Sequence, residues 1–248
     1  MSDFNNGYSR PAPVKADMAV DAGLRSFMLG VYNKVALGLL LSAALAYLTG
    51  SYPPVRDLMF QYTPEGFSFT PLGMVVGFAP LAILLFSAFA MRNASPRAAN
   101  VIYWLVVSLI GASLGTVVLF YTAVSVFSTF LITAAAFGAL SLVGYTTKKD
   151  LSGFGSFLIM GVVGLVIAMI VNMFLQSGIM FLIINAMGVL IFAGLIAADT
   201  QRLKLTYYEL GGNQAAMSVA TSYGALSLYL DFINLFRFLL YFLGVRRD

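Results

Sequence analysis

The sequence contains no cysteine and no histidine. Without cysteine, the chain can form no disulfide and no thiolate metal site. Without histidine, it cannot use Ser-His catalysis, cannot bind zinc through a His-Glu-x-x-His motif, and lacks the usual imidazole pH switch. We therefore expect the protein not to be an enzyme and to need no cofactor.

Charged residues are also scarce, at 10% of the chain, whereas hydrophobic residues make up 60% and the mean hydropathy is +0.90. A soluble domain carries roughly 25% charged residues, so this composition requires a lipid solvent. The net charge of +4 arises from single and paired basic residues at the ends of apolar runs. Such residues are typical of topology signals, so we expect the bilayer, and no nucleic acid, as a partner.

Seven apolar runs have the length of about 20 residues that a membrane-spanning helix needs. None alternates with the period of a β-barrel strand, so an all-α integral membrane protein with seven transmembrane helices is predicted. Residues 1–30 are expected to form a polar cytoplasmic tail, and residues 31–248 a seven-helix membrane domain. The runs are Val31 to Gly50, Leu72 to Met91, Val101 to Tyr121, Ala123 to Tyr145, Phe154 to Leu175, Ile179 to Ala198 and Ala220 to Gly244.

The connections between these runs are mostly short, and the exception, Ser51 to Pro71, is rich in proline and is expected to be a long loop. Within two runs, glycines have the Gly-x-x-x-Gly spacing that lets helix backbones approach closely. These pairs are Gly73 with Gly77 and Gly111 with Gly115.

Basic residues predict the orientation of the chain. Ten of them fall on one side of the seven expected crossings, which predicts a cytoplasmic N-terminus because loops rich in Lys and Arg stay in the cytoplasm. Arg246 and Arg247 oppose the rule if the last run crosses fully, and we expect a full crossing rather than a re-entrant segment. The ten are Arg10, Lys15, Arg25, Lys34, Arg92, Arg97, Lys148, Lys149, Arg202 and Lys204.

Two acidic residues lie in or beside apolar runs: Asp199 ends the sixth run and Asp231 lies deep inside the seventh. A carboxylate at the centre of a span costs about 3 kcal/mol, so it should face a partner or a cavity. Helical spacing places Ser227, Asp231 and Asn234 on one polar stripe, and Asn185 on nearly the same face of the sixth helix as Asp199. These residues could line a polar path, but an interfacial Asp199 and a hydrogen-bonded anchor at Asp231 would explain the pattern equally well.

Arg92 follows the second run and should lie at the depth of Asp199, because both helices are expected to end at the cytoplasmic face. It could therefore pair with Asp199 as a latch. A snorkelling arginine at the membrane interface is the alternative.

The segment Ala225-Leu226-Ser227-Leu228-Tyr229-Leu230-Asp231-Phe232-Ile233-Asn234-Leu235-Phe236, together with Ala198-Asp199-Thr200-Gln201, resembles the signature of the Bax inhibitor-1 (transmembrane BAX inhibitor motif) family. Met91-Arg92 and the stretch from Lys148 to Ser152 are similar to its bacterial branch. The resemblance implies a seven-helix fold with a central C-terminal helix, in the inner (plasma) membrane of a bacterium. It also implies a pH-sensitive calcium leak with Asp199 and Asp231 as pH sensor and Arg92 as latch.

Two close carboxylates in a low-dielectric site are expected to share a proton, which supplies a pH switch without histidine. Two carboxylates plus neutral oxygens would hold calcium only weakly at Asp199 and Asp231, as a permeant ion requires. An intramembrane aspartyl protease is a rival, although the Gly-x-Gly-Asp motif of presenilin-like enzymes is absent before Asp231. A regulatory protein that modulates a membrane protease or a stress response, through its polar tail, is the third alternative.

Overall fold

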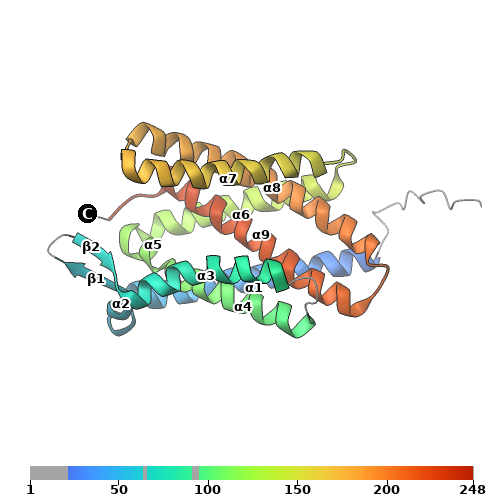
Figure 1. Ribbon diagram of the computed structural model, residues 1–248, viewed down its shortest axis with the longest axis horizontal. Coiled ribbons are helices and arrows are strands. Elements are labelled where there is room, and N and C mark those ends of the chain that lie inside the picture. The colour runs from blue at the N-terminus through green and yellow to red at the C-terminus, as the bar shows by residue number, and fades with distance from the viewer. Residues whose placement is uncertain (1–21, 64–65, 91–94, 248) are drawn as a thin grey trace, which may run out of the picture.

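The computed structural model describes residues 22–63, 66–90 and 95–247 (Figure 1). Eleven elements follow one another along these residues. They are α1 (Ala22–Ser51), α2 (Pro53–Met59), β1 (Phe60–Thr63), β2 (Gly66–Phe69), α3 (Pro71–Ala90), α4 (Pro96–Ser113), α5 (Gly115–Phe120), α6 (Ala123–Thr146), α7 (Ser152–Leu175), α8 (Gly178–Glu209) and α9 (Gln214–Leu243).

Six helical segments are long and apolar enough to cross a membrane: α1, α4 together with α5, α6, α7, α8 and α9. The second apolar run forms α3, whose apolar part over Pro71–Ser87 is shorter than the other six. The described residues therefore form the expected all-α membrane fold with six candidate crossings. The seventh crossing, through α3, stays a prediction.

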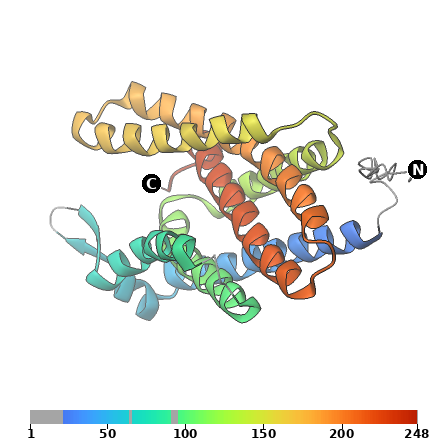
Figure 2. The same ribbon diagram turned by 45° about the vertical axis from the view of Figure 1, so that its right-hand side comes forward.

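Helix α9 forms the centre of the bundle. It runs between the α7–α8 pair and the group of α1, α3 and α4 in both views (Figures 1 and 2), and it packs on α1, α4, α6 and α8. Its side chains Leu228, Tyr229 and Phe232 are almost completely buried. The Tyr229 hydroxyl lies 2.6 Å from that of Ser42 on α1, so a polar contact fixes the two helices together inside the apolar core.

Two helices extend beyond the apolar runs that predicted them. Helix α1 begins at Ala22 and buries Leu24, Phe27 and Met28, so the expected tail boundary at residue 30 lies inside this helix. Helix α8 continues past Ala198 to Glu209 and ends before a pair of glycines with positive φ, at 55° and 84°. Glycine adopts this backbone conformation readily, which explains why the helix ends there.

The bundle has two different ends (Figure 1). The basic end contains the start of α1 and α4, the α6–α7 loop, and the α8–α9 loop. Its described basic residues are Arg25, Lys34, Arg97, Lys148, Lys149, Arg202 and Lys204, whereas residues 1–21 and Arg92 lie outside the described part of the chain. The hairpin end contains α2, the two strands, the short turns before α6 and α8, and the residues after α9.

The segment expected as a long loop is folded. After α2, strand β1 pairs antiparallel with β2, and Phe60 lies opposite Phe69. The ring of Phe67 packs edge-on against Phe120 of α5 at a centroid distance of 4.8 Å, so the hairpin covers the end of the bundle.

The residues after α9 pair with the turn before α6. The Thr122 amide donates to the Val245 carbonyl at 2.9 Å, and the Arg247 amide donates to the Phe120 carbonyl at 2.9 Å. Because α9 begins at the basic end and its C-terminal extension is bound at the hairpin end, the helix traverses the whole bundle. A full crossing of the membrane by α9 stays a prediction.

The two glycine pairs behave differently. A Cβ atom on Gly111 would lie 2.6 Å from the Cα atom of Ser42, and one on Gly115 would collide with Thr49, so this pair lets α4 and α5 touch the backbone of α1. A Cβ atom on Gly77 would meet nothing within 4 Å. Of the two pairs, only Gly111 with Gly115 therefore makes a close helix contact at both glycines.

Candidate functional site

The aspartate site, which we define as Asp199, Ser227 and Asp231, lies between α8 and α9. Asp199 and Asp231 are both buried, with 6% and 5% of their surface exposed. The Ser227 hydroxyl donates to Oδ2 of Asp199, and the charge of Asp199 acts on Asp231. Ser227 and Asp231 are one helical turn apart, so both face α8.

The length of α8 explains how these residues meet. From the apolar runs alone, Asp199 would sit at a helix end while Asp231 lies deep in its span. Because α8 continues to Glu209 before the chain turns into α9, Asp199 lies about 15 Å from the end of its helix and reaches the level of Ser227. Asp199 is therefore buried against α9 inside a helix and not at a helix end, and its depth in the membrane stays a prediction.

Arg202 forms an ion pair with Asp199, with 3.2 Å between Nη1 and Oδ1. The arginine is one turn after the aspartate on α8, and 55% of its side chain is exposed, so the pair contributes at most about 1 kcal/mol. The i, i+3 spacing is visible in the sequence, but we did not single out Arg202 there. Arg92, the expected latch, lies outside the described residues.

One buried carboxyl oxygen remains without a partner at this site. Within the described part of the chain, Oδ2 of Asp231 accepts no hydrogen bond, whereas Oδ1 of Asp199 accepts none but forms the ion pair with Arg202. An ionised carboxylate in such surroundings is destabilised unless a proton, a cation or water compensates it. In the same residues no group of three or more His, Cys, Asp or Glu side chains could hold a metal ion, so the two carboxyls have only neutral oxygens as further ligands.

The residues that follow Asp199 attach α8 to its neighbours. Thr200 donates to Ser141 of α6 at 3.3 Å. Gln201 binds the α6–α7 loop through the Leu151 amide at 2.7 Å and the Lys149 carbonyl at 2.8 Å. These contacts fix α8 at the level of the aspartate site.

The same α6–α7 loop contains Asp150. Its carboxylate accepts a hydrogen bond from the Ser152 amide at 2.8 Å. Hydrogen bonds from the hydroxyl and the amide of Ser152 hold the pKa of Asp150 below its usual range. The start of α7 is therefore held by an ionised side chain.

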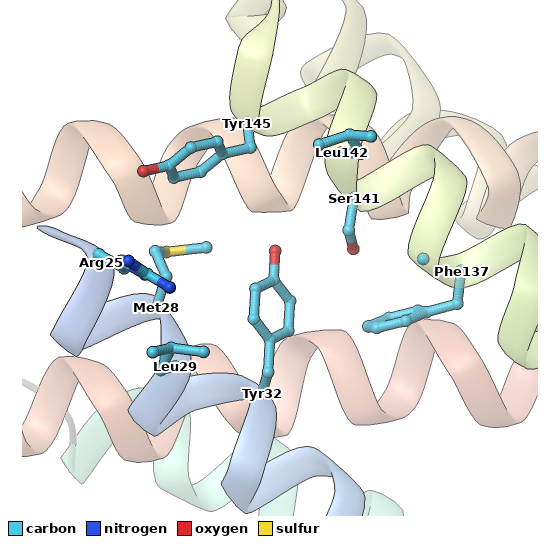
Figure 3. A pocket seen from close by; sticks show the side chains of 9 residues that line it. Arg25, Met28, Leu29, Tyr32, Phe137, Ser141, Leu142 and Tyr145 are labelled. Carbon is cyan, nitrogen blue, oxygen red and sulfur yellow. The ribbon is translucent and has the colours of Figure 1, made fainter. Parts of the chain in front are cut away.

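A cavity of about 640 Å³, which we call the lateral cavity, lies between α1 and α6 (Figure 3). Figure 3 shows the Tyr32 hydroxyl pointing from α1 toward Ser141, with Arg25 at the side of the cavity. The Tyr32 hydroxyl contacts Ser141 and Thr200, the neighbour of Asp199 in sequence. A chain of hydroxyls thus links the cavity wall to α8 beside the aspartate site, and no sequence pattern predicted it.

A second cavity of about 360 Å³, the terminal cavity, lies at the hairpin end between α5, α7, α8 and α9. Asn185 of α8 and Asn234 of α9 both line it, so the structure brings the two asparagines of the expected polar path together. Arg237 also lines this cavity, one turn after Asn234. The polar stripe of α9 therefore continues from Asp231 through Asn234 to Arg237.

Comparison with known proteins identifies the family. Residues 24–248 match the family model described as "Inhibitor of apoptosis-promoting Bax1". The chain belongs to this Bax inhibitor-1 family. The resemblance expected from the segments around Asp199 and Asp231 is thereby confirmed.

Several relatives are similar to this protein over almost the whole chain. An uncharacterized protein of Caulobacter vibrioides is 63% identical over 250 residues, which is 100% of both chains. An uncharacterized protein of Rickettsia prowazekii is 42% identical over 92% of this chain and 93% of its own. The inner membrane protein YbhL of Escherichia coli is 39% identical over 91% of this chain and 94% of its own.

In this Bax inhibitor-1 family protein, the segment from Ala225 to Phe236 carries both polar and apolar contacts of the central helix. Ser227 and Asp231 face α8, whereas Leu228, Tyr229 and Phe232 fill the core. The motif that carries the resemblance is therefore also the segment on which the packing of the bundle depends.

Proposed function

We propose that this Bax inhibitor-1 family protein is a pH-sensitive cation leak through which calcium crosses the membrane. The observation that carries the proposal is the aspartate site, because it holds two buried carboxyls on adjacent helices with incomplete hydrogen bonding. Such groups are unfavourable in a membrane unless they serve a function, and paired carboxyls bind protons and cations.

Protonation supplies the proposed gate. In the proposed closed state Asp199 accepts a hydrogen bond from Ser227, which holds α8 against α9, while Arg202 on the same helix pairs with the carboxylate. Protonation removes the charge that Arg202 binds and weakens the bond from Ser227. Acid then loosens the contact between the two helices and opens the polar stripe between them.

The proposed ion path follows that stripe. Along the stripe, Asp231 lies between Ser227 and the terminal cavity, where Asn185 and Asn234 would offer carbonyl oxygens. Calcium in storage sites takes six to eight oxygen ligands, and two carboxyls with neutral oxygens provide weaker binding. Weak binding favours passage over storage, so calcium is the proposed permeant ion and not a resident metal.

We propose seven crossings and a cytoplasmic basic end. Helix α3 has 20 residues and would extend over about 30 Å, which matches the hydrocarbon core. The concentration of Lys and Arg at the basic end supports a cytoplasmic position of that end. The printed name of YbhL, an inner membrane protein of Escherichia coli, supports an inner-membrane location for this bacterial-type chain.

Arg92 keeps its proposed role as a latch for Asp199, now beside Arg202, whose contact with the same carboxylate is direct. The two arginines would act in sequence or together, since one carboxylate can accept from two guanidinium groups. Arg92→Ala is expected to raise the leak at neutral pH.

The alternatives make different demands on the same site. An aspartyl protease needs both carboxyls free to bind one water, whereas Asp199 is engaged by Ser227 and Arg202. We therefore propose that the protein is not an enzyme. A regulatory partner, such as a membrane protease, would use the polar tail expected over residues 1–30, of which residues 1–21 lie outside the described chain.

Calcium flux in proteoliposomes over a pH series tests the proposal. Asp199→Asn and Asp231→Asn should each shift or abolish the acid response. The double variant should differ from the sum of the single effects, because coupled groups titrate as a unit. Asp57→Asn is the matched control, since Asp57 is exposed on α2 and pairs only with the neighbouring Arg56 among described residues.

Two results would exclude this function. If all three aspartate-site variants conduct as the wild type does at every pH, the carboxyls are structural anchors. If the Asp57 control shifts the response as much as they do, surface charge and not the buried pair sets the pH dependence.

A further inference from the structure

Arg237 is a charged residue inside the last helix, and its side chain is exposed in the bundle. It lies six positions before Leu243, the last residue of α9, and is therefore about 9 Å inside the helix end. An arginine within a span is expensive and usually faces a partner or a water-filled space. Its side chain lines the terminal cavity rather than the apolar core of the bundle.

A second arginine faces the same space. Arg246, from the segment after α9, also lines the terminal cavity. No Asp or Glu belongs to the described lining of this cavity, whose remaining titratable groups are Tyr121 and Tyr241. Asp231, the nearest carboxyl along α9, lies two helical turns away beyond Asn234, so among the described residues two positive charges share the cavity without a compensating negative charge there.

The position of Arg246 is fixed by backbone contacts. It forms an antiparallel bridge with Tyr121. The flanking Val245 carbonyl and Arg247 amide bond to Thr122 and Phe120, each at 2.9 Å. These bonds hold the backbone at Arg246 in place beside the cavity before any ligand arrives, which lowers the entropic cost of binding.

The shape and lining of the cavity indicate the class of ligand. A volume of about 360 Å³ is at the small end of ligand sites and accommodates a small anion or a headgroup, but not a whole lipid. Guanidinium groups offer planar pairs of N–H donors that match phosphate oxygens. Apolar walls, including Phe181 and Leu240, lower the local dielectric and strengthen these contacts.

From this arrangement we propose that the terminal cavity is a binding site for a phosphate group, held by Arg237 and Arg246. The phosphate can come from free inorganic phosphate or from the headgroup of an anionic lipid, because both present the same oxygens to the guanidinium groups. The inference does not depend on ion conduction, since it rests on the two arginines and on the cavity they line.

Two binding measurements test the site and separate the sources. Purified full-length protein in uncharged detergent is titrated with inorganic phosphate by calorimetry. The same protein in phosphatidylcholine nanodiscs is compared with nanodiscs that contain phosphatidylglycerol, and bound lipid is counted by native mass spectrometry. We expect binding in at least one of the two measurements. Binding of inorganic phosphate to the protein in detergent identifies free phosphate as the ligand, whereas binding found only in nanodiscs with phosphatidylglycerol identifies the lipid headgroup.

Variants connect the binding to the cavity. Arg237→Gln should weaken binding by about tenfold or more, because it removes charge-assisted hydrogen bonds. Arg237→Lys keeps the charge but loses the paired donors, so its affinity should be intermediate. Arg247→Gln is the matched control, since Arg247 carries the same charge one residue beyond Arg246 but does not line the cavity.

The outcomes that overturn the proposal are specific. Absence of binding in both measurements overturns the proposal. An equal loss of affinity in Arg247→Gln and Arg237→Gln also overturns it, because general surface charge would then explain the affinity. If Arg237→Gln does not fold, Arg246→Gln replaces it, since this residue lies outside all helices. Wild-type affinity in a folded Arg246→Gln variant would then reject the site.

Discussion

Removal of the Ser227 hydroxyl provides the sharpest test of the aspartate site. This hydroxyl donates to the buried carboxyl group of Asp199, so Ser227→Ala removes that hydrogen bond. A hydrogen bond to a charged group contributes about 1.5 to 3 kcal/mol. Because the bond favours the ionised form, its loss should move the acid activation of calcium flux to higher pH.

Flux in proteoliposomes and the infrared band of protonated carboxyl groups measure this shift independently. Ser227→Thr keeps the hydroxyl and should titrate close to the wild type. Ser87→Ala is the matched control, since Ser87 is a buried serine that donates to the Leu84 carbonyl at 2.9 Å and not to a carboxylate. An unchanged midpoint by both methods in folded Ser227→Ala would refute the reasoning.

Two further predictions concern topology and packing. Because the chain lacks native cysteine, single cysteines introduced at the exposed positions Ser51 and Ser95 can be labelled selectively. An impermeant maleimide applied to intact cells should label the cysteine at position 51 and not the one at position 95. The reverse pattern would overturn the orientation. Gly111→Ala should lower the free energy of unfolding by about 1 to 3 kcal/mol, because the added methyl would overlap the backbone at Ser42. Gly77→Ala is the control and should cause no loss, since a Cβ atom there meets nothing within 4 Å. Equal thermal stability of the two variants would contradict the packing.

Much of the fold follows from hydropathy, because a membrane solvent imposes one strong constraint on every span. The apolar runs predicted the helices, and the helical spacing of Ser227, Asp231 and Asn234 predicted a polar stripe on the last one. Ser227 bonds to α8 and Asn234 lines a cavity with α8 residues, which is the arrangement this spacing indicates.

Hydropathy does not predict the parts of helices that leave the apolar runs. The residues after Ala198 are polar, yet no helix-breaking residue occurs before Gly211, so α8 continues and carries Asp199 inward. A search for the next glycine pair, rather than for the end of the apolar run, would have found this helix end. The same reliance on apolar runs placed the start of α1 too late.

The charged partners were missed for a related reason. Arg202 is one turn from Asp199 and Arg237 one turn from Asn234, so both spacings were available in the sequence. Spacing alone cannot establish that a side chain turns toward a carboxylate or into a cavity, because neighbouring helices decide which directions are open. The packing of α5, α7 and α8 around the end of α9 creates the terminal cavity, and this packing depends on contacts between distant parts of the chain.

The central position of α9 has a consequence for synthesis. The ribosome makes α9 after every helix that surrounds it, so α1, α4, α6 and α8 enter the membrane before their common core exists. During that interval the Lys34 ammonium lacks Ser222, which it later contacts at 2.8 Å, and Ser42 lacks the Tyr229 hydroxyl. Insertion of one helix at the end of translation then completes these polar contacts together. A truncated or stalled chain would therefore keep only the contacts of Lys34 with Asn100 and of Ser42 with the Val107 carbonyl, and would lack every contact that these two residues make with α9.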